Sequence, residues 1–132
     1  MPNRIAHFEI QADDAERAAK FYTEIFGWEI KKWDSPSMEY WMVMTGKQDE
    51  PGGINGGLLK RPCAVPPGPA GTNAFTCTAI VDDFDATAKK ILGSGGKEAM
   101  PKFAIMGMAW QGYFLDTEGN TFGVHQVDAN AK

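Results

Sequence analysis

Several residue patterns that would identify a protein class are missing from this sequence. Its 132 residues include two cysteines, Cys63 and Cys77, with neither CxxC spacing nor a second pair, so no cysteine-ligated zinc site is expected. We interpret Cys77 as a reduced thiol in an apolar strand and Cys63 as one in a proline-rich loop. No signal-peptide pattern and no apolar run of about 18 residues occurs, so we expect a cytoplasmic protein without a membrane span.

Clusters of positive charge are missing as well. The formal net charge is -4 at pH 7, and the sequence pI is about 5.1. Pairs of adjacent basic residues occur only at 31–32, 60–61 and 89–90, which is too little for the electrostatic footprint of a nucleic-acid or anionic-membrane surface. We therefore expect neither nucleic acid nor a membrane as a partner.

Two common catalytic motifs are also absent. The sequence has no Gly-x-Ser-x-Gly elbow, and neither cysteine has an adjacent basic residue to lower its pKa. The glycine-rich run at 49–57 lacks the Lys-Ser/Thr pair of a phosphate-binding loop and precedes a strand rather than a helix. These absences argue against nucleophilic catalysis and against nucleotide binding.

What the sequence does contain is an internal repeat within an ordinary globular composition of 43% hydrophobic and 23% charged residues. Identical residues recur at one constant separation, which indicates two halves built on one plan. The clearest pairs are Asp13 with Asp82, Gly27 with Gly96, and Trp41 with Trp110. We expect a single domain of two modules, at about 4–61 and about 73–128, joined by a proline- and glycine-rich linker at about 62–72.

Each half is predicted to form one strand, one helix and three further strands. In the stretch AHFEIQ, alternation puts Phe8 and Ile10 on one face of the strand and His7 and Glu9 on the other. The remaining strands are expected near 28–33, 39–45, 55–61, 74–81, 96–103, 107–115 and 121–127.

The helices are predicted from their end signals. The first begins either at Asp13, in a capping box with Glu16, or at Asp14, and it ends with Gly27 in a left-handed C-cap. The second is capped by Asp82 or Asp83 and stops in the stretch GSGG. Its apolar residues at helical spacing are Phe84, Ala88, Ile91 and Leu92.

These elements predict an α+β fold in which two βαβββ modules form curved mixed sheets around a cup, with the helices on the outer faces. Strand alternation directs His7, Glu9, Thr76 and Thr78 toward the cup. The segment 101–110 is interpreted as a packed hairpin, with a mobile lid as the alternative.

Aromatic residues at equivalent places in the halves leave two interpretations open. Trp41 and Trp110 either pack against the helices or wall an apolar pocket, in which Gln111 and Tyr113 would be the polar groups. Core packing is the expectation for the neighbouring Met42 and Phe114.

The duplicated plan, together with KFYTEIFGW at 20–28 and DTEGNTFG at 116–123, resembles the vicinal-oxygen-chelate superfamily. This group includes glyoxalase I, bleomycin-resistance proteins, fosfomycin-modifying enzymes and extradiol dioxygenases. The resemblance covers the whole chain and is most similar to small bacterial glyoxalase-like proteins. The two segments are typical of the superfamily but not of one reaction within it.

The resemblance implies a divalent metal in the cup, held by His, Gln or Glu from the first and last strands of each half. Such a metal needs about three protein ligands and open positions for substrate oxygens. His7 matches an expected His, whereas Thr76 stands where a second His is expected and Gly123 where a Glu is expected. No Asp, Glu or His occurs from Pro51 to Val81, so the last strand of the first half supplies none.

The resemblance and the missing ligands together favour a bleomycin-resistance-like homodimer that binds a small organic ligand in the cup without the usual metal centre. The alternative is a metal-dependent lyase, isomerase or dioxygenase with a site rebuilt around His7, Glu9 and His125, and a third is a regulatory or interaction module. The predicted ligand-binding residues are His7, Glu9, Trp41, Thr76, Thr78, Trp110, Gln111, Tyr113, Gly123 and His125.

Overall fold

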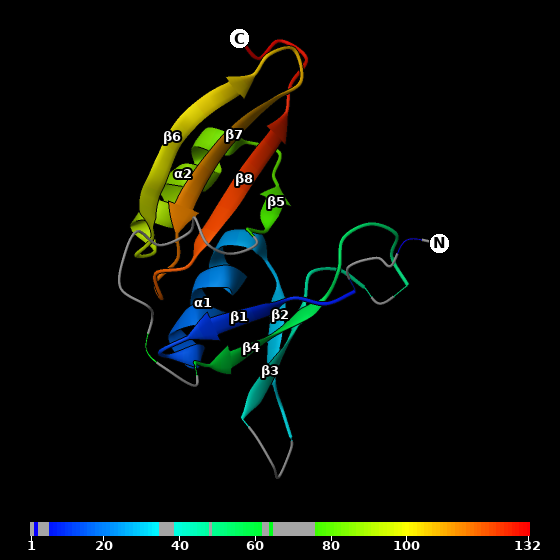
Figure 1. Cartoon of the computed structure of the whole chain (residues 1–132), viewed down its shortest axis with the longest axis vertical. Helices are drawn as coiled ribbons and strands as arrows, with labels where there is room; N and C mark the ends of the chain where they lie inside the picture. The colour runs from blue at the N-terminus through cyan, green and yellow to red at the C-terminus, as the bar shows by residue number, and fades with distance from the viewer. Residues whose placement is uncertain (1, 3–5, 35–38, 48, 62–63, 65–75) are drawn as a thin grey trace. The chain divides into compact units, whose positions relative to one another are not determined.

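The computed structural model describes residues 2, 6–34, 39–47, 49–61, 64 and 76–132 (Figure 1). The chain separates into two compact units, Met1–Val65 and Pro66–Lys132, and each is described by itself. Most of the predicted linker at 62–72, including Cys63, lies outside the described residues. Within the described part, no helix is long and apolar enough to cross a membrane.

The first unit is a four-stranded sheet with one helix. Its elements are β1 (Glu9–Ala12), α1 (Ala15–Phe26), β2 (Glu29–Trp33), β3 (Tyr40–Met44) and β4 (Gly56–Lys60). The strand order is β1-β4-β3-β2, in which β1 and β4 are parallel and the other neighbours antiparallel. The helix covers one face of this sheet and leaves the other, called here the front face, without a helix (Figure 1).

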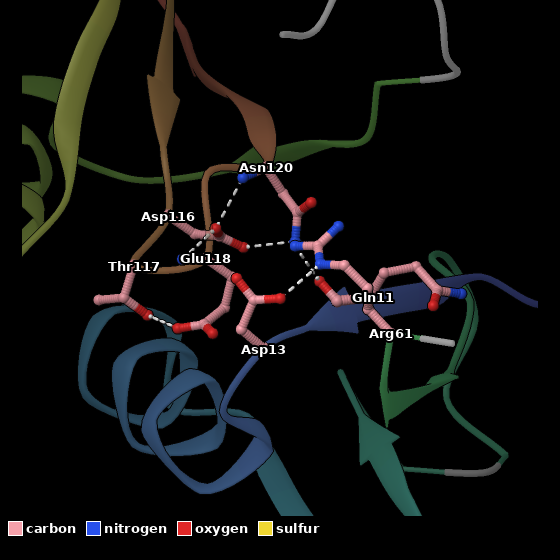
Figure 2. A network of polar contacts seen from close by, with 7 residues as sticks. All are labelled: Gln11, Asp13, Arg61, Asp116, Thr117, Glu118 and Asn120. Atoms are coloured by element: carbon pink, nitrogen blue, oxygen red, sulfur yellow. Dashed lines mark hydrogen bonds and ion pairs between the residues drawn. The ribbon is translucent and has the colours of Figure 1, made fainter. Parts of the chain in front are cut away.

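The ends of α1 follow from its capping residues. The backbone N–H of Arg17 donates to Oδ1 of Asp14 at 3.1 Å, and Gly27 closes the helix with a φ of 70°. Asp14 is therefore the N-cap, and the alternative capping box from Asp13 to Glu16 is wrong. Asp13 instead pairs with Nε of Arg61 at 2.9 Å (Figure 2).

The core of the first unit lies between α1 and the sheet. Ala15 and Ala18 of the helix meet Trp41, Val43 and Leu58, and Phe8 and Ile10 pack against this cluster. The predicted alternation of β1 is thus confirmed. Met42 was expected in the core, but it is 40% exposed. The reason is its parity in β3: Trp41 and Val43 point toward the helix, so Met42 points to the front face.

The second unit repeats this plan. Its elements are β5 (Thr78–Ile80), α2 (Phe84–Gly93), β6 (Lys97–Ile105), β7 (Ala109–Leu115) and β8 (Thr121–Val127). The order β5-β8-β7-β6 has β5 parallel to β8 and the rest antiparallel, with α2 along one face (Figure 1). The two four-stranded mixed sheets, each with its own helix, confirm the predicted α+β class.

Several details of the second unit differ from expectation. Asp83, not Asp82, caps α2, through the backbone N–H of Ala86 at 3.0 Å. Leu92 lies on the exposed side of α2, whereas Phe84 and Ile91 are buried. The first strand starts only at Thr78, so Cys77 precedes it and is exposed rather than sitting in a strand. The segment 101–110 forms the β6–β7 hairpin as expected, but its tip is not packed, because Met106 and Met108 are exposed.

Candidate functional site

A polar cluster occupies the front face of the first unit. Nε2 of His7 lies 2.8 Å from the hydroxyl of Tyr40, which donates to Oε2 of Glu9 at 2.9 Å. Because the phenol proton is used toward Glu9, His7 contributes its Nε2 proton to the phenol oxygen. The structure therefore brings His7 and Glu9 together through Tyr40.

The position of Tyr40 depends on Gly57. This glycine stands opposite Glu9 on β1 and opposite Met42 on β3, at the centre of the front face. A Cβ at position 57 would collide with the Tyr40 hydroxyl and ring. Because Gly57 has no side chain, the phenol of Tyr40 lies over it and reaches both Glu9 of β1 and His7, which precedes β1.

The environment of Tyr40 keeps its phenol protonated. The residue is only 8% exposed, and burial, followed by the hydrogen bond to Glu9, raises the pKa of Tyr40 to about 12. A neutral phenol that donates to a carboxylate fixes both partners in place. Tyr40 was not predicted as a site residue, although its alternation with Met42 in one strand was a usable signal.

Trp41 lies on the opposite side of the same sheet. It belongs to the core cluster, and the ammonium of Lys32 lies 5.3 Å from its ring centroid. Of the two interpretations left open by the sequence, the structure therefore supports core packing for this tryptophan.

The second unit carries a different arrangement on its front face. The strand register places Thr78 opposite Gly123, and Gly123 opposite Tyr113. Gln111 stands opposite His125, and Nδ1 of His125 lies 2.7 Å from Oε1 of Gln111. Because an amide oxygen only accepts, His125 donates its Nδ1 proton, and this bond fixes the orientation of the Gln111 amide.

Two side chains of this face close over Gly123. A Cβ at position 123 would collide with Oγ1 of Thr78 and would lie 2.9 Å from Nε2 of Gln111. A glutamate at this position, which the family resemblance expects as a metal ligand, would require both neighbours to move. The gap that Gly123 leaves in the row of side chains is called here the Gly123 notch; Thr78 and Gln111 close it, and Tyr113 and His125 lie beside it.

The turn before β8 sets the position of the notch. Oδ1 of Asp116 accepts the backbone N–H groups of Glu118 and Asn120, each at 2.8 Å, and Gly119 has a φ of 81° (Figure 2). Asp116 is itself buried. This Asx-type turn fixes the register of β8 on β7, and it thereby places Gly123 opposite Tyr113.

Trp110 lies on the helix side of the second sheet. Its indole Nε1 donates to Asp128 at 3.0 Å, and the ammonium of Lys102 lies 4.5 Å from its ring centroid. Lys102 also pairs with Asp85 of α2 at 3.1 Å. Core-side packing is again the interpretation that the structure supports. Thr76, the remaining predicted residue, is exposed and precedes the strand in which it was expected.

The residues present do not fit the metal centre that the resemblance implies. Thr76 and Gly123 supply no ligand, and Gly123 has no room for one. Among the described residues, no group of three or more His, Cys, Asp or Glu side chains gathers as a metal site would require. A site built from His7, Glu9 and His125 draws on both units and stays a prediction.

Two units of one βαβββ plan define a class of duplicated α+β proteins, and comparisons with known proteins give the family. The family model for the bleomycin resistance protein-like N-terminal domain matches residues 4–46. A glyoxylase-like domain-containing protein of Didymella fabae is 31% identical over 125 residues, covering 92% of this chain and 91% of the relative. The chain therefore belongs to the glyoxalase/bleomycin-resistance family of the vicinal-oxygen-chelate superfamily.

Two further comparisons describe the range of this family. The glyoxylase-named protein CFP32 of Mycobacterium bovis is 31% identical over 130 residues, which are 91% of this chain but 44% of the relative. This chain thus spans less than half the length of that curated relative. TnmS3, an antibiotic binding protein from Streptomyces sp. CB03234, shares the fold with a TM-score of 0.66 at 22% identity, over 96% of this chain and 98% of its own.

Proposed function

We propose that this protein binds a small organic ligand on the front faces of its sheets and does so without the metal centre of its superfamily. The observation that carries the proposal is the Gly123 notch. The family metal ligand is missing there, and Thr78 and Gln111 occupy the surroundings that a glutamate side chain would need. Both side chains are uncharged, and each can donate a hydrogen bond to a ligand.

The chemistry of the front faces supports an organic ligand. Apolar side chains are exposed there beside the polar clusters: Met42 in the first unit, and Phe103 and Ile80 in the second. Mainly apolar walls with a few placed polar groups are typical of small-molecule sites. The fold shared with an antibiotic binding protein is compatible with this function.

A ligand screen with and without chelator tests the proposal. The untagged full chain is screened by thermal shift against aromatic and dicarbonyl compounds, and hits are titrated by calorimetry with and without EDTA. A ligand at about a hundred times its Kd stabilises by about 2.7 kcal/mol, which moves the melting temperature by several degrees. We expect the same Kd in both titrations; binding that EDTA abolishes would contradict the proposal.

The second candidate is a metal-dependent lyase, isomerase or dioxygenase that uses His7, Glu9 and His125. It is supported by the hydrogen bonds that His7 and Glu9 both make with the hydroxyl of Tyr40. In that case EDTA would abolish both turnover and ligand binding, and His7→Ala would remove the metal. The third candidate, a regulatory or interaction module, would give no hit in the ligand screen.

We also propose a cytoplasmic homodimer with no nucleic-acid or membrane partner. The exposed Trp33 and Leu92 provide apolar surface of the kind that a second copy would cover. Light scattering of the untagged chain over a hundredfold concentration range tests the dimer. A mass of one chain at every concentration would contradict it.

A further inference from the structure

An open cavity of about 300 Å³ adjoins the start of α1, on the helix side of the first sheet. Ala15 and Glu16 of the first helical turn line it, together with Lys32 and Trp41 of the sheet. A cavity of this volume is large enough for a small organic molecule. It is separate from the front face of the first unit, because Trp41 points toward the helix.

The two helices begin alike but with side chains of different size. Each follows an aspartate N-cap, and the first helical residue is Ala15 in α1 and Phe84 in α2. The second helical residue is an acid in both, Glu16 and Asp85. Because Ala15 ends at its Cβ, α1 supplies no ring where α2 supplies a phenyl group that is only 2% exposed.

In the second unit, this first helical turn holds an ammonium group. The ammonium of Lys102 lies 5.4 Å from the ring centroid of Phe84 and 4.5 Å from that of Trp110. It also bonds to both carboxylate oxygens of Asp85, at 3.1 and 3.2 Å. The second unit therefore shows what a carboxylate at this helical position binds beside a tryptophan of the sheet: a cation flanked by aromatic rings.

The first unit keeps the carboxylate and the tryptophan but pairs them differently. Trp41 is equivalent to Trp110 in the repeat. The ammonium of Lys32 lies 5.3 Å from the Trp41 ring centroid, but it pairs with Glu39 at 3.4 Å rather than with the helix. Within the described part of the chain, Glu16 makes no ion pair. Four of the six charged residues that line the cavity are acids, which favours a cation over an anion.

Val43 limits how deeply a ring can enter from this cavity. A Cβ at Gly112 would lie 2.6 Å from the ring of Phe84, so the glycine leaves the room that this ring takes. Val43 holds the equivalent position in the first unit and is fully buried. A ring in the first unit is therefore kept out of the core and lies in the cavity, beside Trp41.

We infer that this cavity binds an arylalkylammonium ion, a molecule with a protonated amine and an aromatic ring a few bonds apart. Its ammonium pairs with Glu16, as that of Lys102 pairs with Asp85 in the second unit. Its ring lies beside Trp41, near the ammonium of Lys32. Because the cavity is on the helix side of its sheet, the inference does not depend on the ligand proposed for the front faces.

Three probes separate the contributions of the charge and the ring. Phenethylammonium carries both groups, phenethyl alcohol lacks the charge, and propylammonium lacks the ring. Each is titrated at neutral pH into the isotope-labelled full chain, and binding is followed by NMR chemical shifts. We expect phenethylammonium to bind about fivefold more tightly than the alcohol and about tenfold more tightly than propylammonium. The largest shifts should be those of Ala15, Glu16 and the Trp41 indole.

Two variants test the residues. Glu16→Gln removes the charge at the same size, so it should weaken phenethylammonium about fivefold and leave the alcohol unchanged. Ala15→Leu fills the cavity and should abolish the shifts with both probes. The matched control is Glu98→Gln on β6, which makes the same charge change at an exposed site of the second unit and should keep the affinity.

The outcomes separate this inference from the proposed function. Equal affinity for the three probes, largest shifts outside the cavity, or an affinity that Glu16→Gln leaves unchanged overturns the inference. A lack of any shift with phenethylammonium overturns it too. None of these results bears on the front faces, which the broader ligand screen tests. Circular dichroism checks folding, and the comparison of Glu16→Gln with Glu98→Gln decides alone if Ala15→Leu unfolds.

Discussion

The front faces of the two units share a glycine at an equivalent position but surround it with different side chains. In each, the strand beside the first strand carries a glycine directly opposite a front-face residue: Gly57 opposite Glu9 and Gly123 opposite Thr78. In the first unit the phenol of Tyr40 fills the freed space and satisfies its neighbours. In the second unit the hydroxyl of Thr78 and the amide of Gln111 close over the glycine instead. The duplicated scaffold is thus shared, whereas the chemistry placed on it is specific to each unit.

The comparison predicts that Gly57→Ala is the most damaging small change on either face. The added Cβ would displace the buried ring of Tyr40 and break its bonds to His7 and Glu9. Such overpacking costs about 2–3 kcal/mol. Urea unfolding measures it, with Gly93→Ala as control, because nothing lies within 4 Å of a Cβ there. A loss of similar size in both variants would show that the Tyr40 contact is unimportant.

Tyr40→Phe should have the next largest effect, about 1–2 kcal/mol, because it leaves Glu9 and His7 without their shared partner. The pH dependence is more diagnostic. The folded pKa of Tyr40 is raised from 10.0 to about 12, so the stabilisation is complete below pH 10 and is lost as the pH rises to about 12. The stability difference between the parent chain and Tyr40→Phe should shrink over that range; a constant difference would contradict the role given to the phenol.

The caps of the two helices should respond alike, because the units share their scaffold. Asp14→Ala and Asp83→Ala each remove one capping bond, from Arg17 at 3.1 Å and from Ala86 at 3.0 Å. Each change should cost about 1 kcal/mol of unfolding free energy. Thermal or urea unfolding of the two variants checks this, and costs differing by more than about twofold would break the symmetry of the scaffold.

Gly123→Ala should be the mildest of these changes for stability, at about 1 kcal/mol or less. The Cβ meets the hydroxyl of Thr78, an exposed short side chain that can rotate away, and Nε2 of Gln111, which is the far end of a flexible side chain. The same methyl group therefore costs less here than at Gly57, where a buried ring must leave. Urea unfolding of both glycine variants compares them directly, and a larger loss at Gly123 would reverse the distinction between the faces.

The sequence predicted the scaffold well where the signals were local. Asp14 and Gly27 set the ends of α1, and alternation assigned His7 and Glu9 to one face of β1. It did not resolve the tryptophans, because the parity of Trp41 and Trp110 within their strands depends on packing against helices distant in sequence. Both lie on the helix side.

The sites were predicted only in part, for the same reason. Tyr40 becomes important because Gly57, distant in the chain, vacates the space between it and Glu9. A glycine in a glycine-rich run carries no sign of that role. Gly123 could be singled out because the family pattern expects a glutamate there, but the part played by Thr78 and Gln111 follows only from strand register.

The most direct test of the central claim is the metal content of the untagged protein, purified without chelator and equilibrated with Zn, Ni, Mn and Fe. Elemental analysis should find far less than one bound ion per chain, and His7→Ala should not change the value. One tightly bound ion per chain that His7→Ala removes would contradict the account, because the Gly123 notch would then belong to a working metal site.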